Sequence, residues 1–168
     1  VDLGRVDLGE TTLELETVDL VKIAARAVDS ARSRFPGHRF ALWAEQPVLL
    51  EGDMLRLHRV VGNLIENAAI HGPTDGLVTV EVSQEGEEAV LAVSDRGPGV
   101  PVEDRERIFE RFVRLDGSGA GTGIGLYLVK ALVDSHGGSI DVSDAPGGGA
   151  RFEVRLPAGS PNGGHPVP

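Results

Sequence analysis

Cysteine is absent from the sequence, which excludes disulfide frameworks, cysteine-ligated metal sites and thiol nucleophiles. No apolar run reaches the roughly 18 residues that a membrane-spanning helix needs. The opening residues show no signal-peptide pattern either. Within these 168 residues we therefore expect neither thiol chemistry nor a spanning helix.

Basic residues are in the minority, with 16 Lys and Arg against 26 Asp and Glu, so the formal net charge is −10. A general nucleic-acid surface is disfavoured, because phosphate backbones need clustered Lys and Arg. An acidic chain can still bind a nucleotide when Mg²⁺ and local backbone amides offset the phosphate charge. The length fits one domain, and 40% hydrophobic residues are ordinary for a globular protein.

Glycine is abundant, with 23 residues concentrated in 95–125 and 137–149. Such glycines mark either plain loops or places where the backbone approaches a ligand closely.

Periodicity predicts three main helices. One follows a cap at Asp19, one runs from a cap at Asp53 to Gly72-Pro73, and one spans about 122–136. A shorter helix is expected at 103–111. Strands are predicted at 12–16, 38–44, 47–51, 77–83, 89–95, 139–144 and 150–156.

Because several of these strands are linked as hairpins, the sheet should be mixed, and the fold class is α/β (α+β). A two-layer sandwich with about three helices on one face is the natural architecture. Residues 18–156 form the predicted domain. Residues 1–17 are interpreted as a linker or the end of a dimerisation region, with a short strand, and 157–168 as a disordered tail rich in Pro and Gly.

Two asparagines on the second predicted helix, Asn63 and Asn67, are four residues apart and share a face. Asparagine is unfavourable inside helices, so this pair needs a reason. The pair is either an ordinary solvated face or a set of carboxamides directed at a ligand, with an oxygen available for Mg²⁺.

A buried-type strand ends at Asp95, followed by Arg96-Gly97-Pro98-Gly99. This pattern alone is compatible with a surface turn. A carboxylate at a strand end can also accept a hydrogen bond from an exocyclic amine such as that of adenine.

A third motif, Gly117 to Leu126, is glycine-rich and leads directly into a helix, as anion-binding sites do. It is neither a dinucleotide fingerprint nor a P-loop, because the required glycine and Gly-Lys-Ser/Thr positions do not match.

The order and spacing of these motifs resemble the ATP-binding domain of histidine kinases, in the superfamily of gyrase, the heat-shock chaperone and MutL ATPases. The resemblance covers about 18–156 and implies the Bergerat-type fold. Its motifs are the N box at Asp53 to His71, the first glycine box at Asp95 to Gly99, the F box at Arg107 to Arg114, the second glycine box at Gly119 to Leu126, and SHGGSIDV at 135–142.

The resemblance implies roles for individual residues. Asp95 accepts the adenine amino group, Asn67 ligates Mg²⁺ and Asn63 lies beside it near the phosphates. Arg111 or Arg114 reaches the γ-phosphate. The nucleotide-contacting backbone comes from Gly97, Gly99, Gly119, Gly121, Thr122, Gly123, Ile124, Gly125 and Leu126. Phe109 and Phe112 are expected to anchor the lid, which is the loop predicted at 113–120.

Asn63 stands where ATP-hydrolysing superfamily members carry a water-activating Glu, and an amide cannot take a proton. Glu66 is adjacent to Asn67 but points about 100° away around the helix. The chain is therefore interpreted as presenting a phosphate to another nucleophile.

Two positions depart from the family pattern. Ile70 replaces a common basic residue that contacts phosphate, and it either alters that contact or is simply a core residue. His71 replaces a common aromatic residue, and either stacks on adenine or caps the helix. None of the five histidines has the phosphoacceptor context, and His136 is expected to be structural.

The resemblance implies a protein-histidine kinase with ATP and Mg²⁺ as cofactors. Its expected partners are a dimerisation (phosphoacceptor) domain and a response regulator, without nucleic acid. We expect a monomeric isolated domain, a homodimeric full-length kinase, and a cytoplasmic location below a membrane anchor. Two alternatives remain, an anti-sigma-type serine kinase and a non-catalytic nucleotide-binding module.

Overall fold

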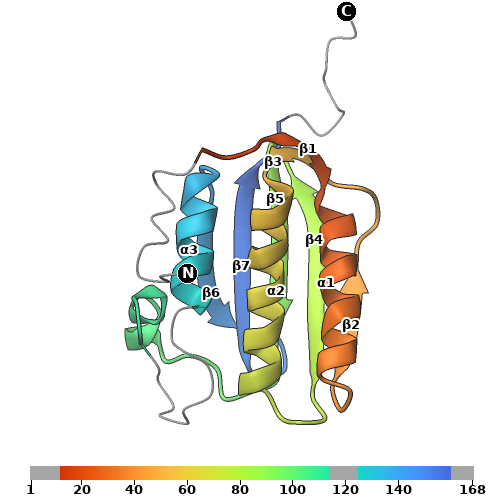
Figure 1. The fold of residues 1–168 in the computed structure, drawn as a ribbon. Coiled ribbons are helices and arrows are strands. Elements are labelled where there is room, and N and C mark those ends of the chain that lie inside the picture. The colour runs from red at the N-terminus through yellow and green to blue at the C-terminus, as the bar shows by residue number, and fades with distance from the viewer. Residues whose placement is uncertain (1–11, 114–124, 160–168) are drawn as a thin grey trace, which may run out of the picture.

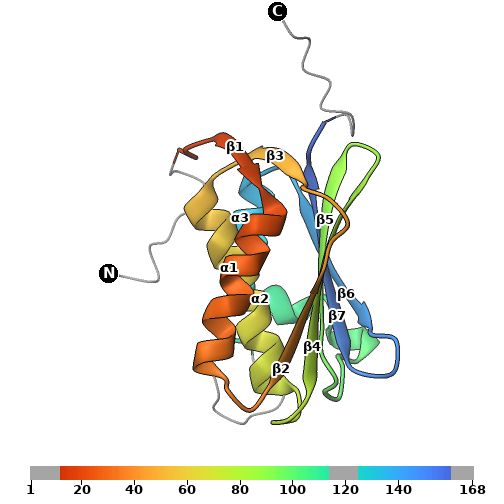
Figure 2. The same cartoon turned by 90° about the vertical axis from the view of Figure 1, so that its right-hand side faces the viewer.

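The computed structural model describes residues 12–113 and 125–159, and it has two layers (Figures 1 and 2). One layer is a five-stranded sheet. The other consists of the helices α1 (Leu20–Arg34), α2 (Met54–His71) and α3 (Gly125–Ser135), which lie on one face of that sheet. The predicted two-layer sandwich is confirmed.

The sheet has the strand order β2-β4-β5-β7-β6 and is mixed, as predicted. Only β2 and β4 pair in parallel, and the remaining neighbours pair antiparallel. Its strands are β2 (Arg39–Trp43), β4 (Leu77–Glu85), β5 (Glu88–Ser94), β6 (Ser139–Asp144) and β7 (Ala150–Pro157). A separate two-stranded sheet pairs β1 (Glu16–Asp19) with β3 (Leu49–Gly52).

Both predicted helix caps are present. The Asp19 carboxylate accepts a hydrogen bond from the Val21 amide, and the Asp53 carboxylate accepts one from the Arg56 amide. These bonds satisfy amides that a helix start leaves unpaired. Gly72 ends α2, since its amide bonds the Ala68 carbonyl before the chain turns away. Among the described residues, no helix combines the length and apolar character required to cross a bilayer.

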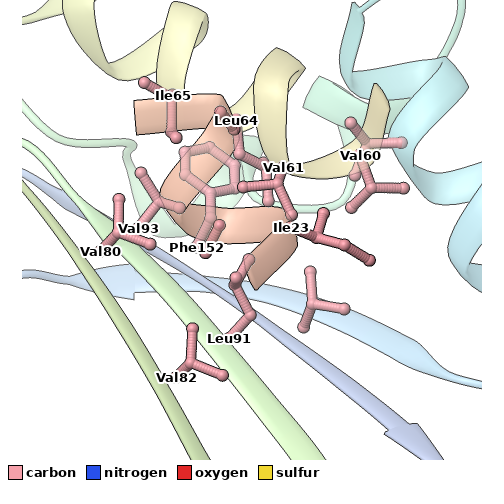
Figure 3. Close-up of a cluster of buried hydrophobic side chains, with 14 of the residues drawn as sticks. Ile23, Val60, Val61, Leu64, Ile65, Val80, Val82, Leu91, Val93 and Phe152 are labelled. Carbon is pink, nitrogen blue, oxygen red and sulfur yellow. The ribbon is translucent and has the colours of Figure 1, made fainter. Parts of the chain in front are cut away.

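The core lies between the helices and the sheet (Figure 3). The helices contribute apolar residues at helical spacing, and the strands contribute every second residue, so both periodicities converge on one layer. Burial of each large aliphatic side chain contributes roughly 1.5–3 kcal/mol. The labelled members are Ile23, Val60, Val61, Leu64, Ile65, Val80, Val82, Leu91, Val93 and Phe152.

The opposite face of the sheet carries ion pairs. Arg155 lies 2.6 Å from Glu153 and 3.3 Å from both Glu85 and Glu88. Hydrogen bonds to Glu153 and Glu88 raise the pKa of Arg155 above its ordinary value. Together with Arg151, which pairs with Glu81 at 2.8 Å, these charges give the sheet a polar outer surface.

Three local predictions were wrong. The strand expected at 12–16 lies instead at β1, because Val18 is the buried residue that pairs with Leu50, whereas Leu15 is exposed. The helix expected at 103–111 consists of two short 3₁₀ turns, η2 (Val102–Asp104) and η3 (Arg107–Phe109).

The third concerns the tail. The body continues past the predicted end at 156, because the Ala158 amide bonds the Glu87 carbonyl and Gln84 bonds the Gly159 carbonyl.

Candidate functional site

Asp95 follows β5 directly and is buried, with 5% of its surface exposed. Its Oδ1 accepts hydrogen bonds from the amides of Gly97 at 2.8 Å and Ala150 at 3.1 Å. Its own amide donates to the Ala150 carbonyl at 2.9 Å. Within 12–113 and 125–159, no group donates to Oδ2. The carboxylate is therefore fixed in direction with one oxygen uncommitted.

The loop after Asp95 packs on the C-terminal end of α2. A Cβ atom built on Gly97 would lie 2.5 Å from the His71 carbonyl oxygen, a distance that real Cβ atoms do not show. A Cβ on Gly72 would lie 3.7 Å from the Asp95 Cβ. Gly97 is thus required by the protein's own backbone. The contact also places Asp95 about 7.5 Å along the helix axis from Asn67, since Gly72 is five residues further on.

Gly149 belongs to this site, and the sequence analysis missed it. Its φ of +101° is in the region that favours glycine, and a Cβ there would lie 2.1 Å from the Asp95 carbonyl oxygen. A Cβ atom built on Gly99, whose φ is +78°, would lie 3.3 Å from the Gly149 carbonyl oxygen. The signal was the run Gly147-Gly148-Gly149, which lies between the strands predicted at 139–144 and 150–156.

Asn63 and Asn67 occupy successive turns of α2, and both are half-buried. Neither carboxamide has a hydrogen-bond partner in the described part of the chain. Glu66 instead pairs with Arg34 of α1 at 3.1 Å, so it points away from Asn67 as predicted. The two amides are consequently available to a ligand.

A groove of about 520 Å³ runs between α1 and α2. Its lining includes Ala27, Ala31 and Phe35 of α1, together with Gly62 and Asn63 of α2. Asn67 and Asp95 are not among the lining residues. This hollow therefore touches one predicted site residue but is separate from the Asp95 loop, where the fixed carboxylate and the close-packed glycines lie.

His136 connects α3 to the start of α2. Its Nε2 accepts a hydrogen bond from the Asp53 amide at 3.1 Å, and its Nδ1 donates to the Leu132 carbonyl at 2.8 Å. Its predicted structural role is confirmed. The end of α3 thus lies at the beginning of α2, and the helices run side by side in opposite directions (Figure 1). At 1.5 Å per residue, Gly125 lies about 16 Å down α3, level with the middle of α2.

The F box contacts the core through Ile108, which is 5% exposed, and Phe109, whose ring is 6.2 Å from the Phe152 ring in edge-to-face geometry. Phe109 therefore anchors this segment, as expected. Phe112 does not, because it is 62% exposed. It lies beneath the guanidinium of Arg111, at 5.0 Å, and not in the core.

The structure also bears on the two positions that depart from the family pattern, Ile70 and His71. Ile70 is not a core residue, since 36% of its surface is exposed. His71 is exposed in the last turn of α2, and the proximity of its carbonyl to Gly97 puts it next to the Asp95 loop.

Part of the predicted phosphate cradle falls outside the described residues, namely Arg114, Gly119, Gly121, Thr122, Gly123 and Ile124. Gly125 and Leu126 form the first turn of α3. A Cβ on Gly125 would meet no described atom within 4 Å, so the described fold gives no steric reason for glycine there.

The site combines the buried carboxylate of Asp95, the two uncommitted carboxamides of Asn63 and Asn67, and the start of α3. The sequence that forms it matches a known family. The family described as histidine kinase-, DNA gyrase B-, and HSP90-like ATPase matches residues 52–160. The chain belongs to this family. Its curated relatives place it among the ATP-binding domains of sensor histidine kinases.

One relative is the probable sensor histidine kinase TcrY of Mycobacterium tuberculosis, 42% identical over 160 residues. The match covers 92% of this chain and 33% of TcrY. Another is the signal transduction histidine-protein kinase/phosphatase MprB of Mycobacterium bovis, 39% identical over 168 residues, covering 94% of this chain and 32% of MprB. The chain thus spans about a third of the length of these relatives.

Solved structures agree with this placement. The mycobacterial sensor histidine kinase MprB superimposes with a TM-score of 0.78 at 34% identity, covering 87% of this chain and 99% of that one. Full-length ShkA in complex with AMPPNP superimposes with a TM-score of 0.80 at 30% identity, covering 94% of this chain and 33% of ShkA.

Proposed function

We propose that this domain binds Mg-ATP and transfers its γ-phosphate to a histidine on a separate dimerisation domain. The observation that carries the proposal is the arrangement at the end of α2. There, buried Asp95 packs against Gly72, five residues beyond Asn67, with its Oδ1 held by the Gly97 and Ala150 amides and its Oδ2 left uncommitted within the described residues. The family match and the AMPPNP complex of ShkA support a nucleotide as the ligand.

Each group has a chemical task in this proposal. The Asp95 Oδ2 accepts a hydrogen bond from the exocyclic amine of adenine. The Asn67 carbonyl oxygen suits Mg²⁺, a hard cation that takes oxygen ligands and keeps several waters and phosphate oxygens. Among the described residues, no cluster of three or more His, Cys, Asp or Glu could hold a metal, so Asn67 is the protein ligand that we propose. The cation would supply charge neutralisation on the phosphates.

The acceptor is proposed to be another domain, because none of the five histidines stands in the phosphoacceptor sequence context. Asn63 cannot take a proton from water, and Glu66 is held by Arg34. His38 and His136 are engaged in hydrogen bonds with backbone groups. Orientation and charge stabilisation are most of what phosphoryl transfer requires of a protein.

The sensor kinase relatives support further proposals about the whole protein. We propose a homodimer whose dimerisation domain carries the acceptor histidine and passes the phosphate to a response regulator. We also propose that the domain lies in the cytoplasm below a membrane anchor.

A phosphotransfer assay tests the proposal. The chain is incubated with labelled Mg-ATP, alone and with a dimerisation domain added in trans. We expect acid-labile, base-stable phosphohistidine on the added domain and none on the chain itself. Asn67→Ala should abolish the product, whereas Glu66→Gln, the matched control on the neighbouring residue, should retain it.

Robust self-labelling, or transfer that survives Asn67→Ala, would contradict this mechanism. Nucleotide binding without any transfer would favour the non-catalytic binding module.

A further inference from the structure

Arg111 has no carboxylate partner in the described part of the chain, although Arg105 and Arg107 on the same segment both pair with aspartates. Its guanidinium carbon lies 5.0 Å from the ring centroid of Phe112 and 5.6 Å from that of Tyr127. Cations over aromatic faces within about 6 Å are attracted by the ring quadrupole. We call these three residues the arginine clamp.

Phe112 adopts a conformation that needs support. Its φ of 63° makes it the only non-glycine residue with positive φ in the described ranges, and a bulky side chain is rare in that region. Such strain persists where the surroundings over-determine it. Because 62% of the residue is exposed, core burial does not hold it, and the ring contact recorded for it within the described residues is the one with Arg111.

The clamp connects two elements. On one side, Arg111 follows the η3 turn, which is fixed to the core by Ile108 and by the contact of Phe109 with the sheet. On the other side, Tyr127 is the third residue of α3. The start of α3 therefore has a direct tie to the anchored F box. Its other end is held independently through His136.

We propose that Arg111 is a positioning residue that holds the first turn of α3 in place through Tyr127. In this role it fixes the Gly125 and Leu126 amides relative to Asn63 and Asn67 on the neighbouring helix α2. The inference rests on the proposed nucleotide function and deepens it, because it assigns Arg111 to α3 and not to the terminal phosphate.

Two readouts test the clamp. First, Arg111→Gln and Tyr127→Leu should each weaken ADP and AMPPNP binding by the same factor, about two- to fivefold for loss of an exposed cation–π contact. The double variant should be no weaker than either single one. Tyr127→Phe keeps the ring and should bind like the parent chain. Second, the amides of the first turn of α3 should exchange hydrogen faster in Arg111→Gln without any nucleotide.

A loss confined to AMPPNP would show that Arg111 contacts the terminal phosphate and would overturn the proposal. Additive effects in the double variant, or unchanged exchange in α3, would also overturn it. The exchange measurement needs no ligand, so it judges the clamp even if the chain binds no nucleotide. Conversely, nucleotide binding that depends on Asp95 but is indifferent to the clamp variants would remove only the clamp.

Discussion

Asp95 uses its two carboxylate oxygens differently. Oδ1 is occupied by the amides of Gly97 and Ala150, and Oδ2 is left for a ligand. Asparagine has one carbonyl oxygen that can replace Oδ1, but its NH₂ group cannot accept a hydrogen bond from an amine. Replacement by Asn therefore separates the structural use of this side chain from its proposed binding use.

We predict that Asp95→Asn binds ATP at least tenfold more weakly while the fold is retained. Hydrogen bonds to a charged group contribute about 1.5–3 kcal/mol, which corresponds to this loss. Calorimetry measures the affinity, and circular dichroism checks the fold. Asp134→Asn, which removes an exposed partner of Lys130 at the far end of α3, serves as the control. Equal affinity of Asp95→Asn and the parent chain would refute the adenine assignment.

At the scale of elements, the sequence predicted the helices better than the loops. The apolar positions of α1 and α2 and both aspartate caps are local patterns, and the structure confirms them. The 3₁₀ turns of the F box follow from tertiary contacts of Ile108 and Phe109, which no local pattern encodes.

The candidate site was predictable in part for the same reason. Asn63, Asn67 and Asp95 belong to motifs that are continuous in sequence. Gly149 is needed because the β6–β7 turn packs against Asp95. The neighbouring hydrogen bond, from the Ala150 amide to Asp95, joins residues that are 55 positions apart in the sequence. Spacing along one sequence does not reveal such contacts.

The first turn of α3 offers a test that separates folding from binding. A Cβ on Gly125 meets no described atom, and neither does one on Gly62 in the middle of α2. We predict that Gly125→Ala and Gly62→Ala both raise the free energy of unfolding, by up to about 1 kcal/mol, through helix propensity. Only Gly125→Ala should weaken ATP binding, because a methyl group there would obstruct phosphate approach.

Chemical denaturation and calorimetry on the two variants measure these effects. If Gly125→Ala binds ATP as the parent chain does, the start of α3 does not contact the phosphates. If Gly62→Ala also binds ATP more weakly, the loss of affinity is a general result of replacing a helical glycine and is not specific to the start of α3.

Asp53 connects α2 to its surroundings and makes stability depend on pH. Burial alone would raise its pKa, but hydrogen bonds from the amides of Glu14 and Arg56 and the Arg56 guanidinium hold the pKa below its ordinary value. A lowered folded-state pKa stabilises the protein above the unfolded value of 3.8, and this contribution is lost as pH falls through the folded value.

We therefore predict that Asp53→Asn, which keeps a capping side chain, lowers the free energy of unfolding at pH 7 by roughly 1–2 kcal/mol. The difference from the parent chain should shrink below about pH 4. Urea denaturation at several pH values measures it. Asp29→Asn, which breaks an exposed pair with Arg32, should change stability by less than about 0.5 kcal/mol. A pH-independent deficit would exclude the ionised carboxylate as the cause.

At the scale of the whole molecule, charge covers the sheet face that the helices leave open. Arg151 and Arg155 are surrounded by Glu81, Glu85 and Glu153, and the net charge of −10 adds repulsion between copies. We predict that the isolated chain is a monomer whose sedimentation coefficient does not change with concentration at low ionic strength. A concentration-dependent dimer would show that another surface of the chain self-associates.

The contact between Asp95 and the β6–β7 turn has a consequence for biosynthesis. A chain emerging from the ribosome carries both asparagines and Asp95 well before Ala150 appears, 55 residues later than the carboxylate it orients. Until β7 pairs with β5, one of the two amides that direct Asp95 is missing. The orientation of Asp95 for nucleotide recognition would thus be complete only when the β6–β7 hairpin has paired with β5.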